Sequence, residues 1–163
     1  MAPAVVKPTL DPTKRDFIIA NLQSIIHKIN SSSSPKGPIP RLVVVSRSRS
    51  CAEILAAYET GQRHFAEYSV GALVVKAPKL PTDIKWHLLG YFKMNKAKRI
   101  VQAMPNLWAI ESVDTMPKAT RLDRAFQGIG RTSPVHTFVQ VHTGEEKSTH
   151  PPLAKSSVAG ESC

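Results

Sequence analysis

Apolar residues follow two alternating patterns along this chain. Short apolar runs of strand length alternate with segments in which apolar side chains recur every three or four positions, as on one face of a helix. The first helical segment is predicted to begin at Asp11-Pro12 and to end near Asn30. We therefore expect an N-terminal helix within residues 1–30. Residues 31–40 are rich in serine and proline, which predicts a flexible linker.

Five strand-length runs follow the linker, with a helical segment between each pair. The predicted strands span residues 42–46, 64–66, 85–89, 107–111 and 135–141. Gly61 suits the C-terminal cap of the first intervening helix. Asp114 is predicted as the N-cap of the last one, and Pro117 falls in its first turn, where proline is tolerated. The end of the chain lacks periodicity, so we predict a partial domain over residues 41–148 and a disordered tail over residues 149–163.

The regular recurrence of strand and helix predicts an α/β fold with a parallel sheet and right-handed crossovers. Five strands cannot close an eight-stranded barrel. The pattern leaves two architectures open: a doubly wound sheet, or a partial (β/α)8 TIM barrel of about five parallel strands that lacks its last units. If the sheet stops after the fifth strand, the outer edges of residues 42–46 and 135–141 have no partner, and self-association through them is expected.

The net charge of +10 is unevenly distributed. Residues 1–100 carry 16 lysines and arginines against 6 acidic residues, whereas residues 101–163 carry 6 of each. A basic surface attracts phosphates, nucleic acid or anionic lipid. The simplest interpretation is a solvated basic face, including Lys93, Lys96 and Arg99, that binds nucleic acid only weakly and without specificity.

Chain length and cysteine content limit the expected number of domains and the expected cellular location. The 163 residues are enough for one domain with a core. No apolar stretch reaches the roughly 18 residues of a membrane span, so no membrane partner is expected. The first residues lack the apolar core of a secretory signal. Cys51 and Cys163 form no disulfide framework, which favours a cytoplasmic location, with a mitochondrial one as the alternative.

The first strand ends at a basic loop that contains Arg47. The carboxyl ends of parallel strands are where ligand sites are built. A lysine at this position could hold a phosphate or form an imine with an aldehyde. An arginine can only hold the phosphate, because its guanidinium stays protonated and is not a usable nucleophile.

Other candidate chemistry is sparse. His64 and His87 are candidate acid–base groups near strand ends, although a structural or solvent-facing role is the simpler interpretation. Trp86 and Trp108 are expected in the core. The sequence contains no dinucleotide-binding or phosphate-binding glycine motif and no metal-ligand spacing, so no metal site and no catalytic residue is predicted.

Several segments occur in an order that resembles a known family. They span residues 45–49, 61–67, 84–90, 95–96, 105–108, 111–114 and 140–146. Lys85-Trp86-His87 at the third strand is the most specific of them. Together, across residues 12–148, they resemble the pyridoxal phosphate homeostasis family, whose fold is similar to the N-terminal barrel of alanine racemase.

The resemblance implies a single (β/α)8 barrel with pyridoxal 5′-phosphate at its mouth, held as a Schiff base by a lysine that ends the first strand. This chain has Arg47 at that position, so no imine is expected. Three further family motifs are altered, around Tyr68, Tyr91 and His142. The family's phosphate-binding loops follow its last strands, which this chain lacks, so it is interpreted as a truncated member.

Three hypotheses for function follow. The resemblance implies a non-enzymatic protein of vitamin B6 homeostasis that binds pyridoxal 5′-phosphate, here with impaired binding. The first alternative is a degenerate fragment that binds no cofactor and acts through protein contacts. The second is a basic module that binds polyanions weakly.

Overall fold

A long amphipathic helix opens the part of the chain that the computed structural model describes, which comprises residues 10–34, 37–131 and 133–141. This helix, α1 (Pro12–Ser32), begins as predicted, because the Asp11 side chain accepts a hydrogen bond from the backbone N–H of Lys14 at 3.0 Å. It runs two residues further than expected, so the predicted linker loses its first residues to the helix. The predicted tail of residues 149–163 lies outside the described residues.

Strands and helices then alternate as the sequence predicts. The strands are β1 (Val44–Val45), β2 (His64–Glu67), β3 (Lys85–Leu88), β4 (Leu107–Val113) and β5 (His136–Val139). The helices are α2 (Cys51–Glu59), α3 (Val70–Lys76), α4 (Ala97–Ala103) and α5 (Met116–Gln127), with short 3-10 turns η1 (Ala77–Lys79) and η2 (Met94–Lys96). Gly61 follows α2 with a φ of +93°, a backbone conformation that favours glycine, so its predicted capping role is confirmed.

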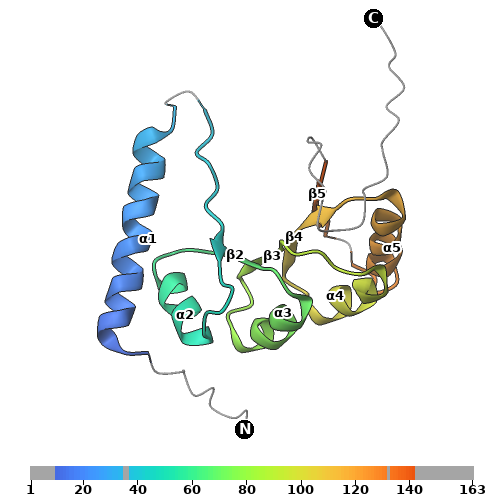
Figure 1. Ribbon diagram of the computed structural model, residues 1–163, viewed down its shortest axis with the longest axis horizontal. Coiled ribbons are helices and arrows are strands. Elements are labelled where there is room, and N and C mark those ends of the chain that lie inside the picture. Colours follow the sequence, from blue (N-terminus) through green and yellow to red (C-terminus); the bar gives the residue numbers. More distant parts are fainter. Residues whose placement is uncertain (1–9, 35–36, 132, 142–163) are drawn as a thin grey trace, which may run out of the picture.

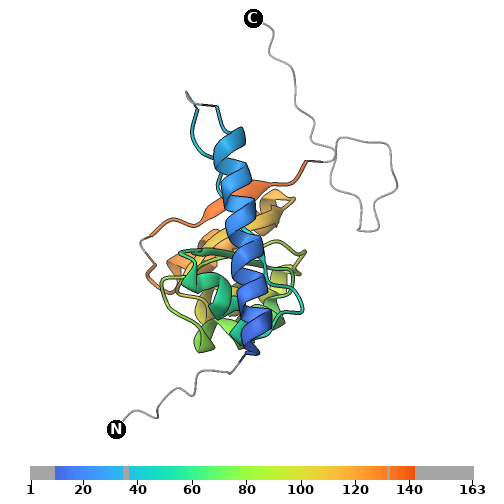
Figure 2. The same cartoon turned by 90° about the vertical axis from the view of Figure 1, so that its left-hand side faces the viewer.

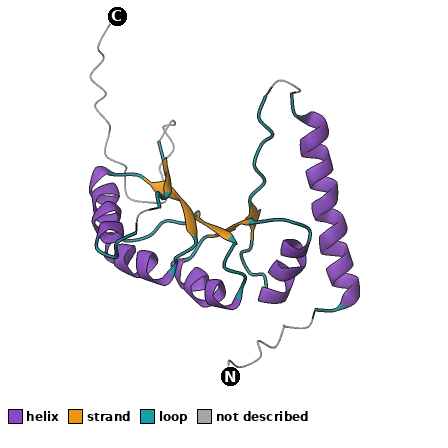
Figure 3. Cartoon of the chain, turned by 180° about the vertical axis from the view of Figure 1, so that it is seen from behind, coloured by secondary structure: helices purple, strands orange, loops and turns teal. Residues whose placement is uncertain are grey.

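The five strands form one parallel sheet in the order β1-β2-β3-β4-β5. Helices α2 to α5 lie along one face of this curved sheet, and α1 stands beside α2 at the β1 end (Figures 1 and 3). A doubly wound sheet would reverse its strand order and carry helices on both faces. The sequential order and the single helical layer therefore identify the second predicted architecture, a partial (β/α)8 barrel.

A constant register builds the core between the sheet and its helices. Val44 pairs with Phe65, Phe65 with Trp86, and Trp86 with Leu107, so one position per unit recurs at the same height in the sheet. Phe65, Trp86 and Leu107 are completely buried. Burial of this row against the helices stabilises the sheet and requires one apolar residue at this height in each strand–helix unit. The core position predicted for Trp86 is confirmed.

The ends of several elements differ from the sequence pattern, and β5 is shorter than the predicted 135–141. Strand β1 has only two paired residues instead of five, because β2 is its single neighbour. Strand β4 extends to Val113, where it pairs with Val139 of β5. The predicted N-cap Asp114 is wrong: Thr115 precedes α5, and the Asp114 carboxylate pairs with Lys118 at 2.6 Å.

Both outer strands of the sheet lack a second neighbour among the described residues, as expected for five units. All residues of β5 are exposed, including Val139 at 72%. Figure 2 shows α1 in front of the opposite, β1 end of the sheet. Within the described ranges, no helix has the length and apolar character needed to cross a bilayer.

Candidate functional site

Strand β1 ends in a buried polar network that fixes the start of the Arg47 loop. The Ser46 hydroxyl lies 2.9 Å from the Glu67 carboxylate and 3.0 Å from the carbonyl oxygen of Ala66. The Lys76 ammonium forms an ion pair with Glu67 and donates a hydrogen bond to the carbonyl oxygen of Ser46 at 2.8 Å. Because Ser46 and Glu67 are almost completely buried, this network holds the carboxyl ends of β1 and β2 against α3.

Arg47 follows this network and is exposed at the carboxyl end of β1, where the sequence places it. Its guanidinium carbon lies 5.4 Å from the centre of the Tyr68 ring, which is a cation–π distance. Ser48 then adopts a left-handed φ of +59°, which turns the chain toward α2. Among the described residues, Arg47 forms no ion pair with a carboxylate.

The amino end of α2 is closed by the chain's own carboxylate. Ser50 and Glu53 form a capping box, with the Ser50 backbone N–H donating to Glu53 at 2.8 Å. That hydrogen bond is the main reason why the pKa of Glu53 falls to about 2, and Lys14 and Arg49 lower it further. This helix end is therefore already occupied and offers no free anion site.

The loops after β2 and β3 pack backbone against backbone. A Cβ atom on Gly90 would lie 1.8 Å from the carbonyl oxygen of Tyr68, so only glycine fits this position. The next residue, Tyr91, has its ring 4.1 Å from the ammonium of Lys118. Lys118 is 2% exposed and pairs with Asp114, so a buried cation lies beneath a half-exposed aromatic ring.

The sheet face opposite the helices carries a histidine chain. His64 Nδ1 lies 2.9 Å from His87 Nε2, and His87 Nδ1 lies 2.5 Å from a Glu111 carboxylate oxygen. Trp108 stacks on His136 with ring centres 4.0 Å apart. Burial lowers the pKa of His64 to about 4 and also lowers that of His87, against the opposing effect of Glu111. Both shifts favour the neutral form of these rings near pH 7.

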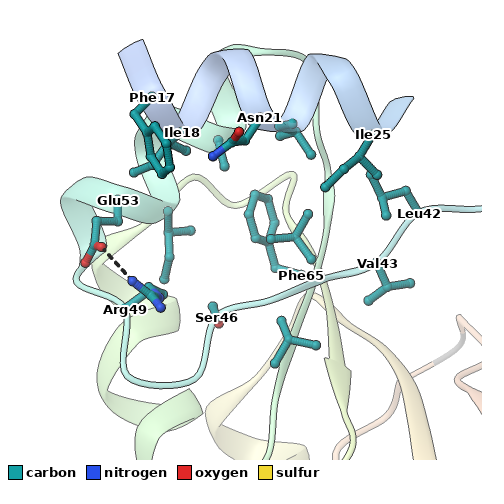
Figure 4. A pocket seen from close by; sticks show the side chains of 15 residues that line it. Phe17, Ile18, Asn21, Ile25, Leu42, Val43, Ser46, Arg49, Glu53 and Phe65 are labelled. Carbon is teal, nitrogen blue, oxygen red and sulfur yellow. Dashed lines mark hydrogen bonds and ion pairs between the residues drawn. The ribbon is translucent and has the colours of Figure 1, made fainter. Parts of the chain in front are cut away.

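An apolar cavity of about 530 Å³ lies between α1 and the outer edge of β1 (Figure 4). Phe17 and Ile25 line it from the helix, Leu42 and Val43 from the chain before β1, and Phe65 from the core. Its polar lining is confined to Asn21, Ser46 and the hydrogen-bonded Arg49 and Glu53. It is therefore suited to apolar side chains and not to a charged cofactor.

The structure brings together some predicted residues and adds others. Arg47 lies at the predicted edge, and His64 and His87 are hydrogen-bonded neighbours. Sequence reasoning missed the contact of Arg47 with Tyr68 and the ion pairs of Lys76 and Lys118. The spacing of Asp114 and Lys118 by four residues was a usable signal for the second pair. In the described part of the chain, no group of three or more histidine, cysteine or acidic side chains could hold a metal ion.

This chain is similar in sequence to curated proteins of other organisms. The pyridoxal phosphate homeostasis protein of Mus musculus is 35% identical over 125 residues, which is 74% of this chain and 45% of the mouse protein. The protein of the same name from Schizosaccharomyces pombe is 30% identical over 132 residues, 80% of this chain and 54% of its own length. The matched region belongs to the pyridoxal phosphate homeostasis protein family. No family model matches the chain.

Two solved structures share the fold. PipY of Synechococcus elongatus, solved with PLP bound, superposes with a TM-score of 0.58 at 36% identity, over 69% of this chain and 50% of PipY. A protein of Bifidobacterium adolescentis at 20% identity shares the fold, with a TM-score of 0.65 over 82% of this chain. The chain spans about half the length of the pyridoxal phosphate homeostasis proteins that it matches.

The residues at the carboxyl edge do not fit covalent attachment of pyridoxal phosphate at position 47. An imine needs an unprotonated amine, which the guanidinium of Arg47 cannot provide. The part-buried amine of Lys76 is engaged in an ion pair with Glu67, and the buried amine of Lys118 in one with Asp114. No step through an imine is therefore derived for this chain.

Proposed function

We propose that this chain is a non-enzymatic pyridoxal phosphate homeostasis protein whose binding of the cofactor is impaired and non-covalent. The observation that carries the proposal is the position of Arg47, exposed at the carboxyl end of β1 and stacked on Tyr68. A guanidinium there supplies charge and hydrogen-bond donors for a phosphate group, but no nucleophile. When bound, the cofactor would supply an aldehyde, and the guanidinium of Arg47 is not an amine that can attack it.

Burial and pairing of the nearby lysines support the non-covalent part of the proposal. A lysine in an ion pair has to leave its carboxylate before its nitrogen can attack an aldehyde. Lys76 has this arrangement with Glu67, and Lys118 has it with Asp114. Lys118 is also almost inaccessible, so an incoming ligand would first have to displace the Tyr91 ring.

Equilibrium dialysis against pyridoxal phosphate tests the binding, and the absorption band of a protonated imine tests its chemistry. We expect weak, reversible binding that inorganic phosphate displaces, without the imine band. Arg47→Ala should weaken it further, whereas Arg121→Ala, which removes an exposed arginine of α5, should not. Strong binding with an imine band would contradict the proposal, as would binding that is equally weak in the wild type and in Arg47→Ala.

The degenerate-fragment hypothesis is kept as the second candidate, because one observation favours it. Both sheet edges lack a partner among the described residues, and an apolar cavity lies beside β1. Such edges suit contacts with another polypeptide. A complete absence of pyridoxal phosphate binding would favour this candidate.

A cytoplasmic location belongs to both versions of the proposal, and the free thiol of Cys51 supports it.

A further inference from the structure

A surface of cations and tyrosines lies at the carboxyl ends of β1, β2 and β3. It consists of Arg47, Tyr68, Tyr91 and Lys93, and we call it the cation–tyrosine face. Tyr68 and Tyr91 are each 45% exposed, and Arg47 and Lys93 are also exposed.

Cation–π contacts and a backbone contact fix the positions of the Tyr68 and Tyr91 rings. Arg47 lies over the Tyr68 ring, and the buried ammonium of Lys118 lies 4.1 Å from the centre of the Tyr91 ring. Gly90 lies against the backbone of Tyr68, which fixes the spacing of the two loops. Each tyrosine has a cation at its ring and a large exposed area. Both rings are therefore presented to solvent as platforms on which a flat group can stack.

The charge of this face is not cancelled locally. Glu67 is paired with Lys76, and Asp114 is paired with Lys118. Within the described ranges, Arg47 and Lys93 have no carboxylate partner. A ligand at this face meets cations next to aromatic rings.

We propose that the cation–tyrosine face binds single-stranded nucleic acid. Proteins that bind single strands combine cations that follow the phosphates with exposed aromatic rings on which bases stack. A polyanion without bases, such as heparin, uses the cations alone. A duplex buries its bases and cannot stack on Tyr68 or Tyr91. Binding at this face should therefore show little preference for base sequence. It should be stronger for single strands than for a duplex or for heparin.

Fluorescence anisotropy with a labelled oligouridine tests the proposal, with a duplex of equal length and heparin as competitors. We expect Tyr68→Ala and Tyr91→Ala each to weaken binding about tenfold, in the range seen for loss of one stacked base. Tyr68→Phe and Tyr91→Phe should bind like the wild type, because they keep the ring. Phe17→Ala, which removes an exposed aromatic ring on α1, is the matched control and should change nothing.

Three results would overturn the proposal. The first is no measurable binding of oligouridine at low salt. The second is binding that Arg47→Ala weakens while both tyrosine-to-alanine variants leave it unchanged, which would assign a plain polyanion surface. The third is an affinity for the duplex that equals the affinity for oligouridine. Photocrosslinking of a thiouridine-containing strand gives an independent check that does not depend on variant folding: crosslinks should map to peptides that contain Tyr68 or Tyr91, and crosslinks confined to other peptides would contradict the assignment.

Discussion

His64 Nδ1 lies 2.9 Å from His87 Nε2, and this distance sets the protonation of both rings. The other nitrogen of His87 faces the Glu111 carboxylate at 2.5 Å, and an ionised carboxylate only accepts hydrogen bonds. His87 therefore carries its proton on Nδ1, and its Nε2 accepts the proton of His64 Nδ1. A proton added to His87 Nε2 would place two donors face to face.

Stability should consequently fall in mild acid. Burial lowers the pKa of His64 from 6.5 to about 4, so between these values the unfolded state binds more protons than the folded state. The contribution of His64 to the free energy of unfolding is complete above pH 6.5 and is lost as the pH falls toward 4. Urea unfolding at several pH values measures this slope. His64→Gln should flatten it, whereas His27→Gln on the exposed side of α1 should not.

Gly90→Ala should destabilise the protein by about 1–3 kcal/mol or prevent folding, because a Cβ atom at 1.8 Å from the carbonyl oxygen of Tyr68 forces the two loops apart. Gly71→Ala is the matched control. Gly71 lies within α3 and its added Cβ would meet only the Ser69 hydroxyl at 3.5 Å, so this change should stabilise by about 0.5–1 kcal/mol. Equal stability of the two variants would show that the Tyr68 contact is not rigid.

Lys76→Met should cost about 3–5 kcal/mol, since it leaves the buried Glu67 carboxylate without its cation. The double variant Glu67→Gln/Lys76→Met should recover much of this loss, because it removes the charge that was left unpaired. Lys79→Met, on the exposed turn η1, should change stability by less than about 0.5 kcal/mol. Thermal and urea unfolding of the four proteins give the comparison. A single-variant loss below about 1 kcal/mol would mean that Glu67 is solvated or protonated.

Borohydride reduction in the presence of pyridoxal phosphate should leave no stoichiometric adduct on the peptide that contains Arg47, because arginine forms no imine. Arg47→Lys alone should restore little, since this chain spans about half the length of its relatives. Mass spectrometry after reduction decides the point. Scattered, sub-stoichiometric labelling of surface lysines is compatible with the prediction, and one full adduct on the Arg47 peptide is not.

The 163-residue chain should self-associate through its strand edges. The unpaired N–H and C=O groups of β1 and β5 and the exposed side chains of Phe138 and Val139 favour pairing with another chain. Val139→Lys should shift the population toward smaller species, because a charge on the edge opposes pairing. Val75→Lys, on the exposed face of α3, is the control. Light scattering coupled to size-exclusion chromatography measures both, and a monodisperse 17.9 kDa monomer with a cooperative melt would contradict the prediction.

The alternation of strands and helices could be predicted because each unit carries its own periodicity and caps. Asp11 and Gly61 are examples, since both act on residues within a few positions of themselves. The lengths of β1 and β4 could not be predicted, because they depend on which neighbour each strand pairs with.

The position of Arg47 could also be predicted, but its environment could not. Its contact with Tyr68 joins two loops that are distant in the sequence. The same holds for the pairing of Glu67 with Lys76, which links a strand to a helix with no fixed spacing. Such contacts depend on how elements pack, and a sequence pattern contains no direct record of that.

The sequential strand order also bears on how the chain folds during synthesis. Each strand pairs with the strand made just before it, as Phe65 does with Val44 and Trp86 does with Phe65. A new unit therefore finds its partner already outside the ribosome and needs no contact with residues not yet made. Because partner residues such as Val44 and Phe65 belong to consecutive units, the sheet can grow one unit at a time from the N-terminus. At every stage the growing sheet ends in one newly exposed strand, and this strand is the surface on which the next unit forms.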